Sequence, residues 1–130
     1  QSELNKDWGN PEFRSCFEFA EDGTMSLTDG ADAFLFNRSP HSLTRYAMEN
    51  RRSMKSEIPA SPIQNPAWKT MKSSYLVCTD DKAVRLDQQR MRAAWADNSI
   101  EIDCDHSPFF SAPKQTADFI LETHLAVAGG

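Results

Sequence analysis

The sequence has few basic residues and no long hydrophobic run. Its 14 Lys and Arg are outnumbered by 19 Asp and Glu, which gives a net charge of −5, whereas binding to a phosphate backbone requires clustered positive charge. The one basic cluster, Arg51-Arg52 with Lys55, is expected to be the solvated end of a helix. No apolar run approaches the roughly 20 residues that span a bilayer. These absences argue against nucleic acid and the membrane as partners.

Cysteine is also scarce. Cys16, Cys78 and Cys104 have neither the spacing of a metal site nor that of a disulfide framework. We expect reduced thiols, which favours a cytoplasmic protein. The chain begins with Gln1 rather than Met, so we expect the natural protein to extend further toward its N-terminus.

The residues that are present indicate a soluble globular protein. The chain is 39% hydrophobic and 25% charged, and its 130 residues suffice to bury a core. The mean hydropathy of −0.60 is on the polar side, and the polar residues are concentrated in residues 1–65. The composition therefore predicts a polar first region followed by a more apolar one.

Two helices are predicted in the first region. The first covers residues 31–36. Ser39 is expected to cap the second, with Pro40 at its first position, and one face of that helix is apolar because of Leu43, Tyr46 and Ala47. Three prolines between residues 56 and 66 then predict an extended connection.

The second region predicts an α/β unit. Tyr75 to Cys78 is a continuous apolar run, as expected of a parallel strand that is covered on both faces. A second strand is predicted over residues 99–103, helices over 86–96 and 111–126, and a loop over 108–110. The side chains expected to face the core are Leu86, Ala93, Ala94 and Trp95 in the first helix and Ala117, Ile120, Leu121 and Leu125 in the second. The order strand, helix, strand, helix is typical of an α/β sheet.

Side chains capable of acid–base chemistry follow both strands. Asp80 and Asp81 come just after the first strand, and His106 lies three residues beyond Asp103. Because functional groups gather at the carboxyl ends of parallel strands, we expect these side chains to lie close together. An Asp can hold a His ring in the tautomer that accepts a proton from a nucleophile. The sequence therefore predicts the acid and base of a nucleophilic triad.

Taken alone, these residues leave other roles open. Asp81 can form a turn or cap the helix that begins near residue 86, and His106 can be a structural residue in its loop. Residues 103–106 are not expected to bind a metal, because consecutive positions point in different directions. His41 and His124 are expected at the surface or its boundary.

Two segments resemble a known family. The first reads Tyr75-Leu76-Val77-Cys78-Thr79-Asp80-Asp81-Lys82-Ala83-Val84, then Gln88-Gln89-Arg90-Met91; the second reads Asp105-His106-Ser107-Pro108-Phe109, then Ser111, Pro113, Ala117 and Asp118. They resemble the acid-bearing strand and the histidine loop of small α/β-hydrolases, in the esterase branch related to plant methyl-ester esterases and hydroxynitrile lyases. The resemblance implies the C-terminal portion of an α/β-hydrolase fold. It also implies that Asp81, rather than Asp80, is the catalytic acid, that His106 is the base, and that neither cofactor nor metal is needed.

A looser resemblance reaches upstream to about residue 20. Asp22-Gly23-Thr24, Ala33-Phe34 and Ala67-Trp68 are similar to parts of the helical cap of these esterases. This implies a cap region over residues 1–72 and the last strand–helix units of the hydrolase core over residues 73–130. Candidates to line an apolar substrate pocket beneath the cap are Phe34, Phe36, Tyr46 and Trp68. Arg38 and Ser39 depart from the family pattern, in which relatives often carry an acid and a Cys.

The family's nucleophile is missing from the sequence. No Gly-x-Ser-x-Gly turn occurs in the 130 residues, nor does the His-Gly type of loop that supplies an oxyanion donor. Ser39, Ser61 and Ser107 lack the required context. We therefore expect this chain to be inactive by itself and to need the N-terminal half of the hydrolase, as a separate chain or a missing segment, to act on a small-molecule ester.

Two alternatives remain. Hydroxynitrile lyases of this branch typically place a Lys directly after the catalytic His, and the Ser107 found here favours the esterase. A hydrolase fold without a nucleophile can instead be a non-catalytic binding module. The amount of exposed apolar surface distinguishes a half-hydrolase from a binding module. A half-domain should associate through such surface, whereas a self-sufficient module should be monomeric.

Overall fold

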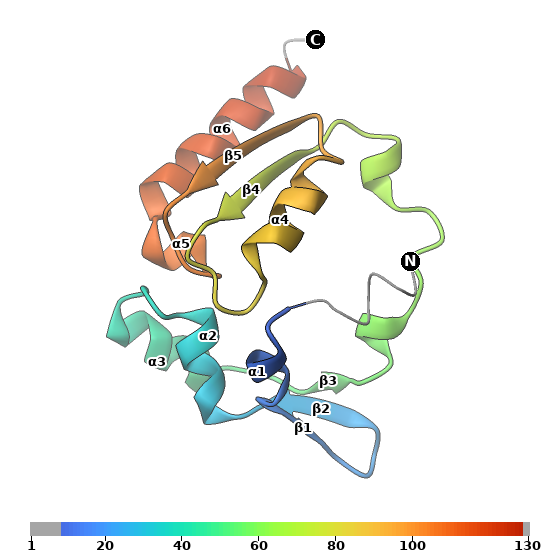
Figure 1. Cartoon of the computed structure of the whole chain (residues 1–130), viewed down its shortest axis with the longest axis vertical. Helices are drawn as coiled ribbons and strands as arrows, with labels where there is room; N and C mark the ends of the chain where they lie inside the picture. Colours follow the sequence, from blue (N-terminus) through green and yellow to red (C-terminus); the bar gives the residue numbers. More distant parts are fainter. Residues whose placement is uncertain (1–8, 129–130) are drawn as a thin grey trace.

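The computed structural model describes residues 9–128, which form two adjoining parts (Figure 1). The elements in chain order are α1 (Pro11–Arg14), β1 (Phe17–Phe19), β2 (Thr24–Leu27), α2 (Asp32–Leu35), α3 (His41–Glu49), β3 (Met54–Lys55), β4 (Ser74–Cys78), α4 (Leu86–Ala93), β5 (Asn98–Ile102), α5 (Pro108–Ser111) and α6 (Pro113–Ala128). Short 3-10 turns lie at Asp29–Ala31, Ile58–Ala60 and Ala67–Lys69. Every helix within the described residues is too short or too polar to cross a lipid bilayer.

The first part is a small antiparallel sheet with short helices. β1, β2 and β3 pair in that order. Asp22-Gly23 forms the turn between β1 and β2, where the positive φ of 78° suits a glycine. The core beside this sheet contains Phe13, Cys16 and Ala31, together with Ala83 from the connection between β4 and α4. The two parts therefore share a buried cluster, and the boundary at residue 72 stays a prediction.

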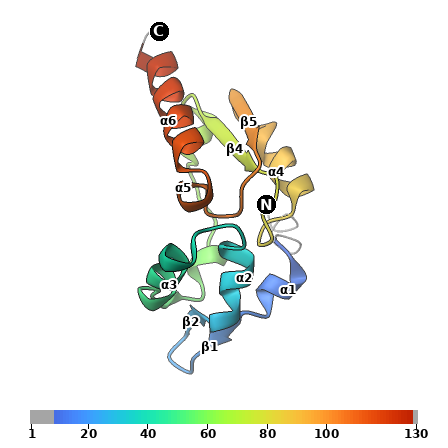
Figure 2. The same cartoon turned by 90° about the vertical axis from the view of Figure 1, so that its left-hand side faces the viewer.

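The second part is a parallel pair of strands with helices on both faces. β4 and β5 run in register from Ser74 opposite Asn98 to Cys78 opposite Ile102. α4 covers one face of this pair and α6 runs along the other (Figure 2). Cys78 and Ile102 are buried against Cys104 and Ala112. The parallel pairing places the carboxyl ends of both strands at one edge, as the sequence predicts.

Several local predictions are wrong. Residues 108–110 belong to helix α5 rather than to a loop, and Pro108 suits the first position of that helix. The helix that begins at Leu86 ends at Ala93, so Ala94 and Trp95 lie beyond it and are exposed. Ser39 does not cap α3, because its hydroxyl donates to the distant Asp105 carboxylate.

The last helix is where burial differs most from the prediction. α6 forms as expected, but the apolar residues assigned to its core face are exposed: Ala117, Ile120, Leu121 and Leu125. Ile120 and Leu121 keep 59% and 60% of their surface, respectively. Helical periodicity identifies an apolar face, but it does not say whether the described residues cover that face.

Candidate active site

The hydrogen bonding between β4 and β5 continues past the ends of both strands. The Thr79 amide donates to the Ile102 carbonyl at 2.9 Å, and the Asp80 amide donates to the Cys104 carbonyl at 3.0 Å. This extension keeps the two connections side by side just beyond the sheet. As a result, Asp81 and His106 meet although they lie 25 residues apart.

Asp81 is held by four contacts. Its Oδ1 accepts hydrogen bonds from the amides of Ala83 at 2.7 Å and Val84 at 2.8 Å. Its Oδ2 accepts one from Gln89 Nε2 at 3.2 Å and lies 2.9 Å from His106 Nδ1. The side chain is only 4% exposed. Asp81 therefore stabilises the turn after β4 and contacts His106 with its other oxygen, while α4 is capped at Arg85 instead.

His106 is oriented by this contact. A carboxylate at Nδ1 favours the tautomer with the proton on that nitrogen, which leaves Nε2 free to accept a proton. The side chain keeps 37% of its surface exposed. The ring is therefore partly open to an approaching nucleophile.

Gln89 supports the pair from helix α4. It is 3% exposed, accepts a hydrogen bond from the Cys78 amide at 2.9 Å and donates to the carbonyls of Cys78 and Val84 at 3.0 Å each. Its contact with Asp81 ties α4 to the acid. The periodicity of this helix does not assign Gln89 to the core-facing side. The only sequence feature that points to a role for Gln89 is its position in segment 88–91, which resembles the family.

The other carboxylate, Asp80, faces elsewhere. It accepts from Asn37 Nδ2 at 3.1 Å and pairs with Lys82 Nζ at 2.6 Å. The structure thus brings Asp81, and not Asp80, to His106.

The four apolar pocket candidates lie in different places. Phe36 contacts Phe110 of α5 in a tilted arrangement, with ring centroids 5.9 Å apart, so it lies beside the helix that follows His106. Phe34 packs against Phe13 in the core of the first part. Tyr46 is 63% exposed on α3. The structure therefore does not gather the four around the Asp81–His106 pair.

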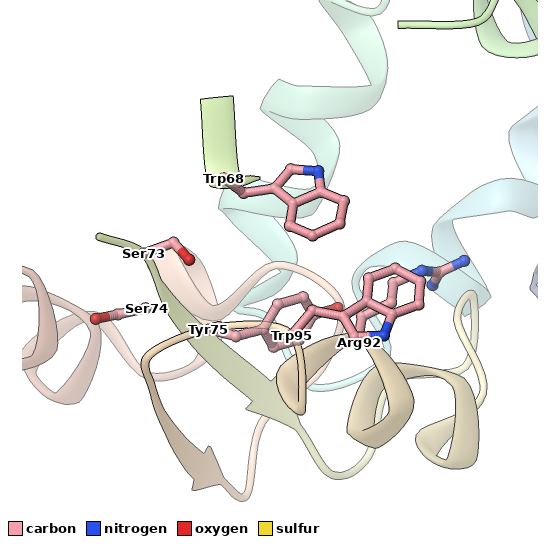
Figure 3. Close-up of a pocket in the computed structure, with 7 residues that line it drawn as sticks. Trp68, Ser73, Ser74, Tyr75, Arg92 and Trp95 are labelled. Atoms are coloured by element: carbon pink, nitrogen blue, oxygen red, sulfur yellow. The ribbon is translucent and has the colours of Figure 1, made fainter. Parts of the chain in front are cut away.

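Trp68 belongs to a separate cavity. It stacks on Trp95 with centroids 5.5 Å apart. The two rings border a cavity of about 370 Å³ that Tyr75 and Arg92 also line (Figure 3). Because Ser73 and Ser74 at the start of β4 line it too, this cavity lies at the opposite end of the strand from Asp81.

The serines considered as nucleophiles have other partners. Ser39 Oγ donates to Asp105, and Ser61 Oγ donates to the Glu57 carbonyl at 2.9 Å. Ser107 is buried. Both His41 and His124 are exposed. Within residues 9–128, no three His, Cys, Asp or Glu side chains are grouped so that they could hold a metal ion.

A parallel strand pair that presents an Asp–His pair at its carboxyl edge is the arrangement of an α/β-type hydrolytic site. Residues 3–119 match the sequence profile described as "Alpha/beta hydrolase family". The chain therefore belongs to the alpha/beta hydrolase family, and the predicted fold class is confirmed.

Solved structures agree on the fold. The chain is similar to polyneuridine aldehyde esterase, with 18% identity and a TM-score of 0.73 over 87% of this chain and 50% of that one. A mutant of the same esterase gives 17% identity and a TM-score of 0.65 over 82% and 46%, respectively. The chain thus spans about half the length of these structures. No curated protein sequence matches it.

Proposed function

We propose that this chain supplies the acid and base of a serine hydrolase that acts on carboxylic esters. One observation carries the proposal: the buried Asp81 carboxylate lies 2.9 Å from His106 Nδ1 while the ring remains partly exposed. An orienting acid and an accessible base are what a serine nucleophile requires. The similarity in fold to an esterase supports the choice of substrate class.

In the proposed reaction, His106 Nε2 accepts the proton of a serine hydroxyl as the serine oxygen attacks the ester carbonyl carbon. Asp81 stabilises the imidazolium that forms. The tetrahedral intermediate collapses to an acyl-serine, and the departing alcohol takes the proton from His106. Water then attacks the acyl-serine with His106 again as base, releasing the acid and restoring the serine.

The serine and the oxyanion donors come from outside this sequence. The chain holds no Gly-x-Ser-x-Gly turn and spans half the length of the esterase structure. We assign both groups to an N-terminal half, present as a preceding segment or a separate chain. Among the apolar candidates we select Phe36 for contact with substrate, because it lies beside α5, the helix that follows His106.

Ser107 favours ester hydrolysis over a lyase reaction. It occupies the position after His106 at which related lyases typically carry a Lys, and it is 3% exposed with its amide bonded to Asp105 at 2.9 Å. A buried hydroxyl there supplies no charge to a departing cyanide.

Fluorophosphonate labelling of the native protein tests the proposal. The protein is purified from its source with any segments or chains that accompany residues 1–130, labelled, and read by mass spectrometry of its peptides. We expect one labelled serine outside residues 1–130, with labelling lost after His106→Ala and retained after His124→Ala. A native protein that takes no label, or takes it within residues 1–130, contradicts the proposal.

A further inference from the structure

A fully buried carboxylate stands directly before His106 in the chain. Asp105 is 0% exposed and accepts four hydrogen bonds. Oδ1 accepts from the Ser107 amide at 2.9 Å and from Ser111 Oγ at 2.7 Å. Oδ2 accepts from the Arg38 amide at 2.9 Å and from Ser39 Oγ at 2.8 Å. A buried charge is tolerated when its lone pairs are satisfied in this way.

The Oδ1 side fixes the loop that carries His106. Ser107 follows His106 directly, and Ser111 lies in α5. The Asp105 amide also donates to Ser111 Oγ at 3.3 Å. The backbone is therefore held on both sides of His106, which restricts the directions in which its ring can point.

The Oδ2 side holds a segment from the other part of the molecule. Arg38 and Ser39 lie 67 and 66 residues before Asp105, respectively. They belong to the connection between α2 and α3, and this connection faces the carboxyl edge of the β4–β5 pair (Figure 2). Asn37 Nδ2 donates to the Asp80 carbonyl at 3.2 Å, and the Arg38 guanidinium pairs with Asp103. We call residues 37–39 the docking segment. This segment contacts three acidic residues at the sheet edge, namely Asp80, Asp103 and Asp105.

We propose that Asp105 is a positioning residue that couples the docking segment to the orientation of His106. The proposal rests on the function assigned to His106 above. One carboxylate joins the two elements, so undocking residues 38–39 leaves half of its hydrogen bonds unmade and frees the loop that holds the ring. Residues assigned to the cap would in this way influence the base without touching it.

The variant Asp105→Asn tests whether Asp105 positions His106 through its hydrogen bonds and not merely through its negative charge. Each carboxylate oxygen faces one backbone N–H and one hydroxyl. An amide has a single oxygen, so in either orientation its NH2 group faces the N–H of Arg38 or of Ser107. One buried backbone N–H therefore loses its acceptor, and this costs free energy because water cannot replace the acceptor in a buried site. The matched control is Asp103→Asn, which breaks a surface ion pair on the same docking segment, with Asp103 76% exposed.

Nuclear magnetic resonance of the 15N-labelled protein, kept together with any segment or chain that accompanies residues 1–130, gives the readout. We expect the Asp105→Asn variant to lose the slowly exchanging Nδ1 proton of His106 and to show both ring tautomers. The amide of Arg38 or Ser107 should exchange at least about tenfold faster, as expected for one lost buried hydrogen bond. Asp103→Asn should keep the ring signal, and the exposed His41 and His124 serve as references.

Ser39→Ala provides a second test that keeps the carboxylate and decides the matter if Asp105→Asn does not fold. It removes one donor from the docking segment, and we expect faster exchange of the His106 ring proton, with no such change in the exposed Ser42→Ala. A folded Asp105→Asn with an unchanged His106 tautomer, or a Ser39→Ala ring signal equal to that of Ser42→Ala, overturns the coupling. These measurements report the geometry of the His106 ring and not ester hydrolysis. A negative result here therefore contradicts the coupling alone, whereas a negative fluorophosphonate result contradicts the proposed function.

Discussion

At the scale of single residues, the Asp81 carboxylate lies 2.9 Å from His106 Nδ1, which favours the proton on that nitrogen. The Asp81→Asn variant would keep its amide oxygen at the Oδ1 position, because the Ala83 and Val84 amides require an acceptor there. Its NH2 group would then donate to His106 Nδ1 and leave the proton on Nε2. If the proposed ester hydrolysis is correct, we expect kcat of the complete protein to fall about 10⁴-fold, the loss typical of this substitution in a Ser-His-Asp triad.

Asp80→Asn is the matched control for that experiment, measured by the same ester hydrolysis assay. Asp80 is adjacent in the chain and bonds to Asn37 and Lys82, not to His106. We expect its kcat to stay within about tenfold of the unmodified protein, because the ring keeps its partner. Equal losses from the two variants would contradict the assignment of Asp81 as the acid.

Asp105 makes a residue-scale prediction about pH. Burial by itself would raise the pKa of the Asp105 carboxyl, but hydrogen bonds from Ser111, Arg38, Ser39 and Ser107 outweigh burial and hold the pKa below its ordinary value of 3.8. A carboxyl with a lowered folded-state pKa contributes stability above its unfolded pKa of about 3.9. This contribution is lost as the pH falls through the folded-state pKa.

Urea unfolding at pH 7, 5 and 3 checks this sign. The stability difference between the unmodified chain and Asp105→Asn should be largest at pH 7 and 5 and should shrink at pH 3. Arg38, Asp80, Asp103 and His106, which lie around Asp105, are present in both proteins, so the subtraction removes most of their own titration. A difference that grows toward pH 3 would mean that the carboxyl is not held ionised in the folded state.

At the scale of elements, Gln89 fixes α4 to the end of β4. Replacing it with Met keeps the volume but leaves the buried amide and carbonyl of Cys78 without their side-chain partner. We expect Gln89→Met to lower the free energy of unfolding by about 2–4 kcal/mol, since each unsatisfied buried group costs about 1–3 kcal/mol. The measurement is urea unfolding, with the exposed Gln115→Met of α6 as the control, expected to change stability by less than about 0.5 kcal/mol.

The elements that the sequence predicts best are those whose signal is local. The apolar run at Tyr75–Cys78 indicates a buried strand by itself, and β4 forms there. The meeting of Asp81 and His106 also follows from a simple rule, because parallel strands end at one edge.

The features that could not be predicted depend on partners far away in the chain. Ser39 has the composition of a helix cap, yet it donates to a carboxylate 66 residues later. Gln89 and Asp105 are polar residues whose burial requires several donors and acceptors to converge from separate elements. Neither periodicity nor propensity contains that information.

At the scale of the whole molecule, an apolar helix face and two strand edges remain uncovered. The outward face of α6 exposes Ile120, Leu121 and Leu125. Within residues 9–128, β4 and β5 pair only with each other, so each has an unpaired edge. Large exposed apolar patches and open strand edges are typical of surfaces that another element covers. This pattern supports an accompanying segment or chain, as the proposed hydrolase requires.

This surface makes the last prediction. We expect the 130-residue chain by itself to self-associate, seen as a sedimentation coefficient that rises with protein concentration. The double variant Ile120→Glu with Leu121→Glu should weaken this association because charge on the patch opposes its burial. Gln115→Glu with His124→Glu adds similar charge to the same helix without removing apolar side chains, and it should associate like the unmodified chain. A chain that stays monomeric at all concentrations and unfolds cooperatively would instead fit a self-sufficient binding module, because a half-domain cannot leave this helix face in water without cost.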